Sequence, residues 1–313
     1  MPREGGSRSR TCHLSPVTCH LSPVTCHLSL ATTHMYTTLI TATQLLAHPD
    51  AIVFDCRFDL ADPAAGATAY ATGHIPGAHY LHLDQDLSGA KTGRNGRHPL
   101  PEAETLLEKL RACGVHNDSQ VIACDAHGGM FAARLWWLLR WLGHEAVAVL
   151  DGGLPAWQAS GGVLTQALPP PRSGALMRRP SLQHVVTANE VLANLTQNKF
   201  LIVDARAPDR FRGENETLDP IGGHIPGACN RFFKDNLQAD GCFKNAAQLG
   251  TEWRALLQPR TSKETIQQCG SGVTACHNIL ALEIAGLTRP ALYAGSWSEW
   301  CADPTHPVAT GNS

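Results

Sequence analysis

The chain has 313 residues, with 25 lysines and arginines against 27 aspartates and glutamates, which gives a formal net charge of −2. A chain of this length is expected to form about two domains, and its core is large enough to need no disulfide staples. The charge pattern contains no basic stripe to neutralise a phosphate backbone, and the densest apolar stretch, at 135–142, is far shorter than the ~20 residues of a membrane span. We therefore expect neither nucleic-acid nor membrane partners.

The N-terminal segment repeats a short unit at 11–29, reading TCHLSPV twice and then TCHLSL. Pro16 and Pro23 prevent a continuous helix and no apolar stripe is present, which predicts a disordered low-complexity tail over residues 1–34. The Cys-His pairs of the repeat do not match the ligand spacing of a zinc site, so no metal is expected. The segment lacks the continuous apolar run of a secretory signal, and together with unbridged cysteines this favours a cytoplasmic protein.

The remainder of the chain contains an internal repeat. The motif GHIPGA stands at 73–78 and again at 223–228, and each copy follows an apolar run ending in Asp-x-Arg, IVFDCR in the first case and LIVDAR in the second. Further on, pairs of glycines and of tryptophans share one common offset: Gly143 with Gly286, and Trp157 with Trp300. Two copies of one domain are therefore predicted.

Each copy has the pattern of an α/β domain. In chain order we expect a strand, a turn, a second strand-like segment, a helix, a strand, a buried helix capped by glycine, a strand, a GG or GS turn and a short helix. This alternation predicts a parallel sheet with helices on both faces. We expect the first domain at 36–165, a proline-rich linker at 166–185 and the second domain at 186–311.

Cys269 is the candidate nucleophile of the second copy. Ligands of α/β sheets bind where strands end and helices begin, and Cys269 stands before a helix predicted to start within or just after 270–274. Gly270 and Gly272 let successive backbone N–H groups converge on the sulfur, and the helix dipole adds positive charge. Such a loop lowers a thiol pKa and activates the thiolate. From local context alone, a small buried cysteine remains the alternative.

The corresponding loop of the first copy carries Asp125 in the place of Cys269, with Cys124 one position away. We therefore expect the first copy to be non-catalytic. Cys276 lies on another face of the second helix, and the remaining cysteines have no glycine-rich loop after them. Apolar helical spacing places three tryptophans of the first copy in the core or at the domain interface: Trp136, Trp137 and Trp141.

The sequence resembles the two-domain rhodanese family in three features taken together: the doubled GHIPGA, the DGG and GSW turns before tryptophan, and the loop CGSGVTAC. The spelling CGSGVT resembles its 3-mercaptopyruvate sulfurtransferase branch, and the resemblance covers about residues 36–311. It implies a sulfurtransferase in which Cys269 takes a sulfane sulfur from a small anionic donor and carries it as a persulfide. It also implies a thiophilic acceptor such as cyanide, a thiol or thioredoxin, and no cofactor or metal is expected.

The resemblance also implies roles for individual side chains. Arg210 stands where family members hold the carboxylate or sulfonate of the donor, and Ser271 and His74 would help to activate the donor thiol, whereas His224 is expected to be structural. The backbone of the loop is expected to hold the persulfide through its N–H groups: Gly270, Ser271, Gly272, Val273 and Thr274.

At the positions that indicate the donor, this sequence departs from the usual pattern of both kinds of enzyme. Mercaptopyruvate enzymes usually have a second arginine where this chain has Asp219, whereas thiosulfate-preferring enzymes usually carry basic residues where this chain has Gly270 and Ser271. We expect 3-mercaptopyruvate ahead of thiosulfate. A thiosulfate-preferring enzyme remains an alternative.

Two other functions are compatible with a cysteine at the start of a helix: phosphatase activity and binding without catalysis. A cysteine phosphatase needs an arginine where this chain has Ala275, which disfavours phosphoryl chemistry. A binding module without catalysis stays open, because the segment SKETIQQ that enters Cys269 is more polar than a buried strand is expected to be.

Overall fold

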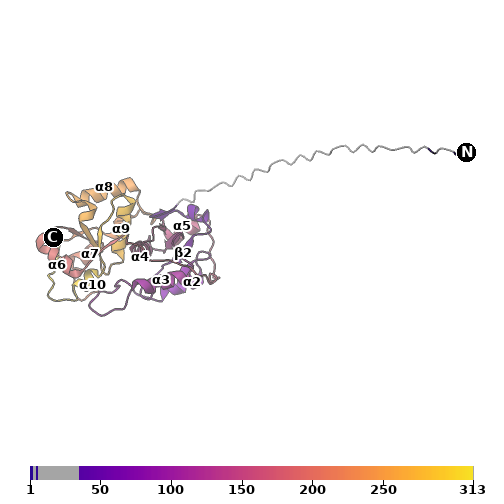
Figure 1. Cartoon of the computed structure of the whole chain (residues 1–313). Helices are drawn as coiled ribbons and strands as arrows, with labels where there is room; N and C mark the ends of the chain where they lie inside the picture. The colour runs from indigo at the N-terminus through magenta and orange to yellow at the C-terminus, as the bar shows by residue number, and fades with distance from the viewer. Residues whose placement is uncertain (3–4, 6–34, 313) are drawn as a thin grey trace. The chain divides into compact units, whose positions relative to one another are not determined.

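Two five-stranded parallel sheets organise the computed structural model, which describes residues 1–2, 5 and 35–312. The chain divides into the units Met1–His34 and Met35–Ser313, and both sheets belong to the second unit (Figure 1). The repeat at 11–29, and with it the expected tail, lies outside the described residues. We call the part of the chain that forms the first sheet the first half, and the part that forms the second sheet the second half.

The first sheet has the strand order β1-β5-β4-β2-β3, with every pair parallel. Its central strands read IVFD, VIAC and VAVL, and such continuous apolar runs are typical of strands buried on both faces. The strands are β1 Leu39–Ile40, β2 Ile52–Asp55, β3 His79–Tyr80, β4 Val121–Cys124 and β5 Val147–Leu150. The helices are α1 Ala42–Leu46, α2 Ala65–Thr72, α3 Ala103–Ala112, α4 Ala132–Trp141 and α5 Gly153–Ala159.

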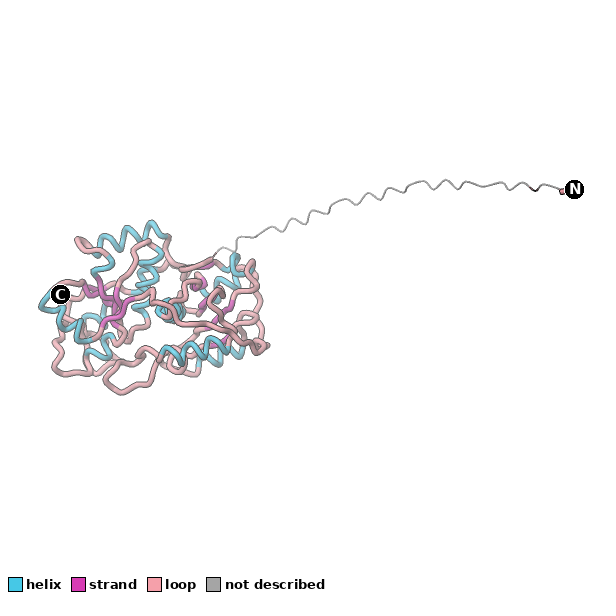
Figure 2. Tube along the Cα trace, in the orientation of Figure 1, coloured by secondary structure: helices cyan, strands magenta, loops and turns pink. Residues whose placement is uncertain are grey.

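The second sheet repeats this order as β6-β10-β9-β7-β8, again with every pair parallel. Its strands are β6 His184–Val186, β7 Leu201–Asp204, β8 Cys229–Asn230, β9 Thr265–Gln268 and β10 Ala291–Tyr293. Its helices are α6 Ala188–Gln197, α7 Pro208–Arg212, η1 Phe233–Asn236, α8 Ala246–Leu257, η2 Ser262–Glu264, α9 Thr274–Ile284 and α10 Ser296–Trp300. The matching order confirms the predicted pair of α/β units, each with strands between helices (Figure 2).

The two halves share one hydrophobic core. Helix α4 packs against α9, and the largest cluster of buried side chains contains residues of both halves. Trp136 and Trp137 are fully buried in this cluster, as the sequence predicts. Gly143 and Gly286 follow α4 and α9 with φ values of 84° and 72°, the left-handed conformation expected of a glycine that ends a helix.

Strand β9 is buried although its sequence is polar. It lies between β7 and β10, and Thr265, Gln267 and Gln268 are each fully buried. Thr265 Oγ1 donates to the carbonyl of Ser262, and Gln267 Nε2 donates to Thr265 Oγ1, whereas Gln267 Oε1 and both polar side-chain atoms of Gln268 are buried without a hydrogen-bond partner among the described residues. The polar composition therefore does not prevent the segment from forming the strand that supports Cys269.

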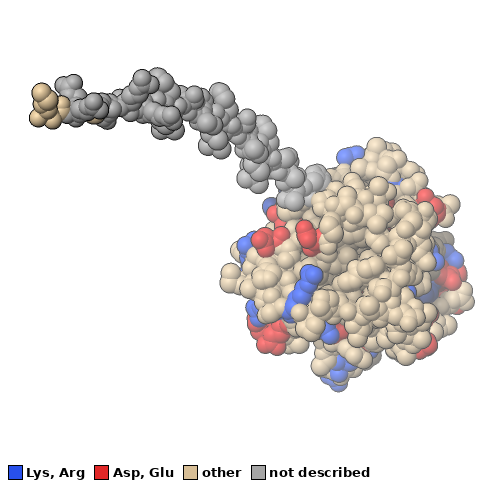
Figure 3. Space-filling model, turned by 90° about the vertical axis from the view of Figure 1, so that its right-hand side faces the viewer, with Lys and Arg blue, Asp and Glu red and all other residues tan. Residues whose placement is uncertain are grey.

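Charged side chains are interspersed on the surface. On the face shown in Figure 3, basic and acidic residues are scattered among neutral ones, and no basic stripe runs across it. In the described part of the chain, no helix has the length and apolar character needed to cross a bilayer.

Candidate active site

Cys269 lies at the turn from β9 into α9, and its side chain is 2% exposed. The N–H of Gly272 donates to its Sγ at 3.1 Å, and it is one of the five loop N–H groups expected to face the sulfur. Gly272 has φ +78°, and a Cβ at this position would lie 2.2 Å from the carbonyl oxygen of Ala294, so only glycine fits. Helix α9 begins at Thr274, within the predicted interval, and directs its positive dipole end towards this loop.

The start of α10 forms hydrogen bonds with the backbone of the Cys269 loop. The N–H of Cys269 donates to Ser296 Oγ at 3.1 Å, and its carbonyl accepts from the N–H of Trp297 at 3.0 Å. The next carbonyl, of Gly270, accepts from the N–H of Ser298 at 2.9 Å. Ser296 has φ 54°, an uncommon conformation for a residue other than glycine, and it is fully buried. The motif GSWSEW is thus part of the site, which the sequence pattern did not indicate.

A buried arginine of the first half supports the same loop. Arg134 in α4 is completely buried, and its Nη1 donates to the carbonyl of Gly272 at 3.1 Å. Its Nη2 donates to the carbonyl of His98 at 3.0 Å. Burial lowers the pKa of Arg134, yet a guanidinium stays charged under ordinary conditions and places a positive charge behind the sulfur. An arginine in the first turn of the largely apolar helix AARLWWLLRW was the signal that could have revealed it.

The other described cysteines are poor nucleophiles. Cys276, one turn into α9, donates its S–H to the carbonyl of Gly272, and burial raises its pKa to about 12. Burial also raises the pKa of every other cysteine in this group, which keeps them protonated: Cys56, Cys113, Cys124, Cys229, Cys242 and Cys301.

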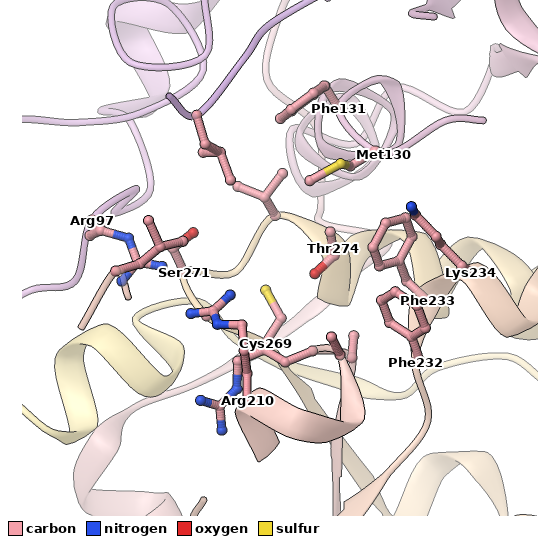
Figure 4. Close-up of a pocket in the computed structure, with 17 residues that line it drawn as sticks. Arg97, Met130, Phe131, Arg210, Phe232, Phe233, Lys234, Cys269, Ser271 and Thr274 are labelled. Carbon is pink, nitrogen blue, oxygen red and sulfur yellow. The ribbon is translucent and has the colours of Figure 1, made fainter. Parts of the chain in front are cut away.

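Cys269 opens into a cavity of about 260 Å³ that both halves line (Figure 4). Arg97, Arg210 and Ser271 form its polar side. Besides Lys234, the lining includes six large apolar side chains: Leu60, Met130, Phe131, Leu218, Phe232 and Phe233. Val273 and Thr274 also line the cavity, next to the sulfur. The site has the dimensions of a small-molecule pocket with one charged end and one apolar end.

Ser271 belongs to a chain of three polar side chains that crosses between the halves. Its Oγ lies 2.7 Å from His98 Nδ1, and His98 Nε2 lies 3.3 Å from Asp84 Oδ1. Burial lowers the pKa of His98 to about 3, so the ring is neutral at pH 7. In the tautomer with its proton on Nε2, the ring donates a hydrogen bond to Asp84 and accepts one from the hydroxyl of Ser271 at Nδ1. Serine, histidine and aspartate linked in this order form the arrangement that activates a hydroxyl group.

The structure does not bring His74 to the cavity. Its Nδ1 lies 2.8 Å from the carbonyl oxygen of Tyr70, its ring stacks on Tyr70, and its Nε2 lies 3.1 Å from the carbonyl oxygen of Ala167. His224 has the same surroundings in the second half, stacked on Phe211 with Nδ1 2.9 Å from its carbonyl oxygen. The geometry gives both histidines of the GHIPGA motifs a turn-stabilising position.

Arg210 lies in α7 and lines the cavity as expected. Its Nε and Nη2 donate to the carboxylate of Glu216 at 2.8 to 3.1 Å, which holds the guanidinium in a fixed plane. The hydrogen bond from Arg210 lowers the pKa of Glu216 against the opposing effect of its burial, so the pair is ionised. Arg210 is therefore a preorganised cation at the polar end.

The corresponding loop of the first half holds an anion of its own. Asp125 follows β4 directly and is 1% exposed, and its carbonyl accepts from the N–H of Leu154 at 2.8 Å, as that of Cys269 accepts from Trp297. The carboxylate accepts four backbone N–H groups at 2.8 to 3.0 Å, those of His127, Gly129, Phe131 and Ala132. The first half thus has the loop geometry without a nucleophile.

The chain belongs to the rhodanese family, because the model of the rhodanese-like domain matches residues 39–160 and again 187–303. A Pseudomonas aeruginosa protein named "Probable 3-mercaptopyruvate sulfurtransferase" is 50% identical over 279 residues, covering 88% of this chain and 98% of its own. The thiosulfate sulfurtransferase of Mus musculus is 34% identical over 254 residues, covering 78% and 83%. The solved 3-mercaptopyruvate sulfurtransferase from Leishmania major has a TM-score of 0.77 at 29% identity, covering 86% of this chain and 75% of that one.

Proposed function

We propose that this protein is a sulfurtransferase that moves sulfur from 3-mercaptopyruvate, through a persulfide on Cys269, to a thiophilic acceptor such as cyanide or a thiol. The observation that carries the proposal is the position of Cys269 Sγ in the cavity, with the Gly272 N–H on the sulfur and the hydroxyl of Ser271 held by His98 in the same loop. The 50% identity to a relative named for mercaptopyruvate, against 34% to one named for thiosulfate, supports this donor.

The first half-reaction forms the persulfide. The thiolate of Cys269 attacks the sulfur of the donor, an S–S bond forms, and the C–S bond breaks with its electron pair passing to the carbon of a pyruvate enolate. The proton of the donor thiol moves to that carbon and completes pyruvate. The persulfide anion that remains accepts the N–H of Gly272 and lies at the positive end of α9.

The second half-reaction regenerates the enzyme. The acceptor attacks the outer sulfur of the persulfide, the S–S bond breaks, and its electron pair returns to Cys269 as a thiolate. With cyanide the product is thiocyanate, and charge balances without an external oxidant or reductant. Cys269 and several large apolar side chains line the same cavity, through which the proposal has a small acceptor approach the sulfur.

Ser271, His98 and Asp84 supply the proton transfer. Neutral His98 accepts the hydroxyl proton of Ser271, which frees the oxygen to take the proton of the donor thiol and pass it on to the enolate carbon. Asp84 holds the tautomer of His98 that makes this possible, and the hydrogen bond from Lys91 keeps Asp84 ionised against the effect of burial. The proposal thereby assigns to His98 the role that the sequence suggested for His74.

Thiocyanate formation from 3-mercaptopyruvate and cyanide tests the function directly. We expect transfer in the wild type, with kcat/KM higher for mercaptopyruvate than for thiosulfate, and none in Cys269→Ser. Cys276→Ser is the matched control, since Cys276 lies one turn further on and stays protonated. Mass spectrometry after donor alone should show one added sulfur atom on the wild type only. Full transfer by Cys269→Ser would overturn the mechanism, and a preference for thiosulfate would overturn the donor.

We also propose the domain division that the sequence suggests, with a non-catalytic unit at 36–165, a linker at 166–185 and a catalytic unit at 186–311. The placement of Asp125 and Cys269 in equivalent loops supports it. A reducing compartment such as the cytoplasm suits the protein, because all cysteines of residues 35–312 are free thiols.

A further inference from the structure

A second cavity lies at the end of the strands opposite to Cys269. It has a volume of about 690 Å³, and its lining comes from segments at the start of β6, β9 and β10 and from the last turns of α4 and α9. Cys269 follows the carboxyl end of β9, so this strand runs from the second cavity towards the active site. The sheet topology alone predicts no ligand at the amino ends of the strands.

The lining of this cavity has more positive than negative charge. Arg140 of α4, Lys263 of η2 and Arg289 before β10 contribute three cations, and Glu283 of α9 contributes one carboxylate. The C-terminal ends of α4 and α9 also face this region, and at about half a negative charge each they offset about one cation. The cavity therefore remains positive after these charges are counted.

The structure gives a partner to one of the three cations. Arg140 Nη2 lies 3.7 Å from Glu283 Oε2, and the guanidinium lies over the ring of Trp136 at 5.2 Å from its centre. Lys263 and Arg289 are exposed, and neither has a carboxylate within ion-pair distance in the part of the chain that the structure describes. Arg140 thus has a structural role, whereas the other two charges are available to a ligand.

Gln183 provides an independent observation, because its amide lacks a partner. The residue lines the cavity and is 9% exposed, and neither Nε2 nor Oε1 has a hydrogen-bond partner among the described residues. Its backbone is fixed, since its N–H donates to Ser181 Oγ at 3.1 Å and its carbonyl accepts from the same hydroxyl at 2.8 Å. Buried polar groups are nearly always hydrogen-bonded in folded proteins, so this amide indicates a ligand that forms hydrogen bonds.

Arg289 has an uncommon backbone conformation. Its φ of 66° lies in the left-handed region, which is unfavourable for a residue with a long side chain. Among the described residues other than glycine, only Asn198 and Ser296 share this feature. Asn198 ends α6, and Ser296 bonds to the Cys269 loop. Backbone strain of this kind is concentrated at binding and catalytic sites, which agrees with a ligand contact at Arg289.

We propose that this cavity binds a phosphate group through Lys263, Arg289 and the amide of Gln183. A phosphate group carries nearly two negative charges and three terminal oxygens, so it can accept hydrogen bonds from three separate segments of the chain. A carboxylate has one charge and two oxygens, which a single guanidinium group already satisfies. The volume lies within the range of small-molecule sites, so the phosphate is either free or part of a small ester.

Calorimetric titration in a phosphate-free buffer tests the ligand chemistry. The probes are inorganic phosphate, ribose 5-phosphate, ribose and acetate. We expect the wild type to bind inorganic phosphate or ribose 5-phosphate with a Kd of about 1 mM or tighter, and acetate at least about tenfold more weakly. Tighter binding of the ester assigns the site to a phosphate ester, and equal or weaker binding assigns it to free phosphate. Failure of both to bind, or equal binding of ribose or acetate, overturns the proposal.

Variants of the lining test the location of the site. Arg289→Asn removes the charge and keeps a residue that tolerates the left-handed conformation, and Gln183→Leu removes the amide. We expect the Kd of the phosphate probe to weaken at least about tenfold in Arg289→Asn and at least about threefold in Gln183→Leu. Arg254→Asn, which removes an exposed arginine of α8 outside the lining, is the matched control. Lys263→Met, at an exposed position, replaces either variant that fails to fold, with a tenfold weakening expected.

An unchanged Kd in any folded variant of the lining overturns the proposal, and so does equal weakening in Arg254→Asn. A thermal melt adds a second readout, because a ligand that binds only the folded protein raises its midpoint. Phosphate should raise the midpoint of the wild type and not that of Arg289→Asn, and equal shifts in both contradict the site. These measurements follow binding and not turnover, so their result holds whether or not the protein transfers sulfur.

Discussion

The loops after β4 and β9 are equivalent in the two halves but surround different side chains. In the first half the loop closes around Asp125, whose carboxylate receives four backbone N–H groups. In the second half the equivalent position is Cys269, whose sulfur receives the N–H of Gly272 and faces a cavity. In both cases backbone N–H groups of the loop donate to the side chain that follows the strand, an arrangement that suits an anion.

The difference lies in where the anion comes from. Asp125 supplies a permanent charge on its own short side chain, so the first loop is satisfied by the folded chain and has a structural role. Cys269 presents one sulfur atom to the cavity, and on the proposed mechanism a second sulfur joins it there, near the N–H of Gly272 and the start of α9. On the proposed mechanism, the two loops differ in the source of the anion: the side chain of Asp125 supplies it in the first loop, and the transferred sulfur supplies it in the second.

Cys269→Asp is expected to have the largest effect, because it gives the second loop the same residue type that the first loop has at Asp125. We expect thiocyanate formation to fall at least about 10³-fold, since no nucleophilic sulfur remains. The thermal midpoint should stay at or above that of the wild type, because the loop N–H groups would bind the new carboxylate. Cys269→Ser is the control for loss of sulfur without a new charge. Residual turnover above about one per cent in the aspartate variant would contradict the assignment of the nucleophile.

His98→Gln tests the proposed contribution of the first half to catalysis, which is made through Ser271 of the second loop. We expect kcat with 3-mercaptopyruvate to fall about 100-fold, in the range typical for loss of a general acid or base, with KM little changed. His74→Gln is the matched variant and should affect stability more than kcat, because His74 contacts backbone carbonyls. A larger fall in kcat for His74→Gln than for His98→Gln would return the role to His74.

Asp125→Ala tests whether the first loop is structural. Four buried N–H groups would lose their acceptor, and we expect the free energy of unfolding to fall by about 2 kcal/mol or more. Urea denaturation measures this change, and Asp125→Asn, which retains one oxygen acceptor, should lose less. Transfer activity per folded molecule should stay within about threefold of the wild type. Loss of activity without loss of stability would show that the first loop takes part in catalysis.

The smallest expected effect concerns the contact that joins the two loops. His277 in α9 lies with Nε2 3.0 Å from the carbonyl oxygen of Gly128, and burial lowers its pKa to about 4. The unfolded chain therefore binds this proton at higher pH than the folded chain does. Stability is fully present above about pH 6.5 and falls as the pH drops towards 4, by at most about 1.4 kcal/mol per pH unit.

His277→Gln should flatten that acid slope when urea unfolding is measured between pH 7 and pH 5. His116→Gln removes an exposed histidine and serves as the control, with the wild-type slope expected. An identical slope in His277→Gln and the wild type would assign the acid sensitivity to other groups, His98 first among them, since burial lowers its pKa as well.

The parts of the fold that depend on local pattern were predictable. Apolar strands, the repeated GHIPGA and the glycines that end α4 and α9 each leave a signal within a few residues, and so does the glycine-rich loop of Cys269. Strand β9 departs from its pattern, because pairing with β7 and β10 buries its polar side chains, of which only Thr265 and Gln267 form side-chain hydrogen bonds among the described residues. Local composition alone therefore underestimates its burial.

The residues missed at the site are those whose use depends on the approach of the two halves. Arg97 and His98 lie in a loop without periodicity, and nothing in their neighbourhood along the chain indicates contact with residues more than a hundred positions away. The role expected of His74 comes from the family resemblance and not from its surroundings in this chain. The GHIPGA motif is repeated because it forms the same turn twice, which is a structural reason.

Gly270 has a consequence for the charge that surrounds the nucleophile. A Cβ at this position would lie 2.9 Å from Arg97 Nη2 and at ordinary contact distance from Arg210, so any side chain at 270 shifts the end of Arg97. A basic residue here would also add a third positive charge beside these two guanidinium groups. Gly270 therefore leaves the space beside Cys269 to cations that come from other parts of the chain.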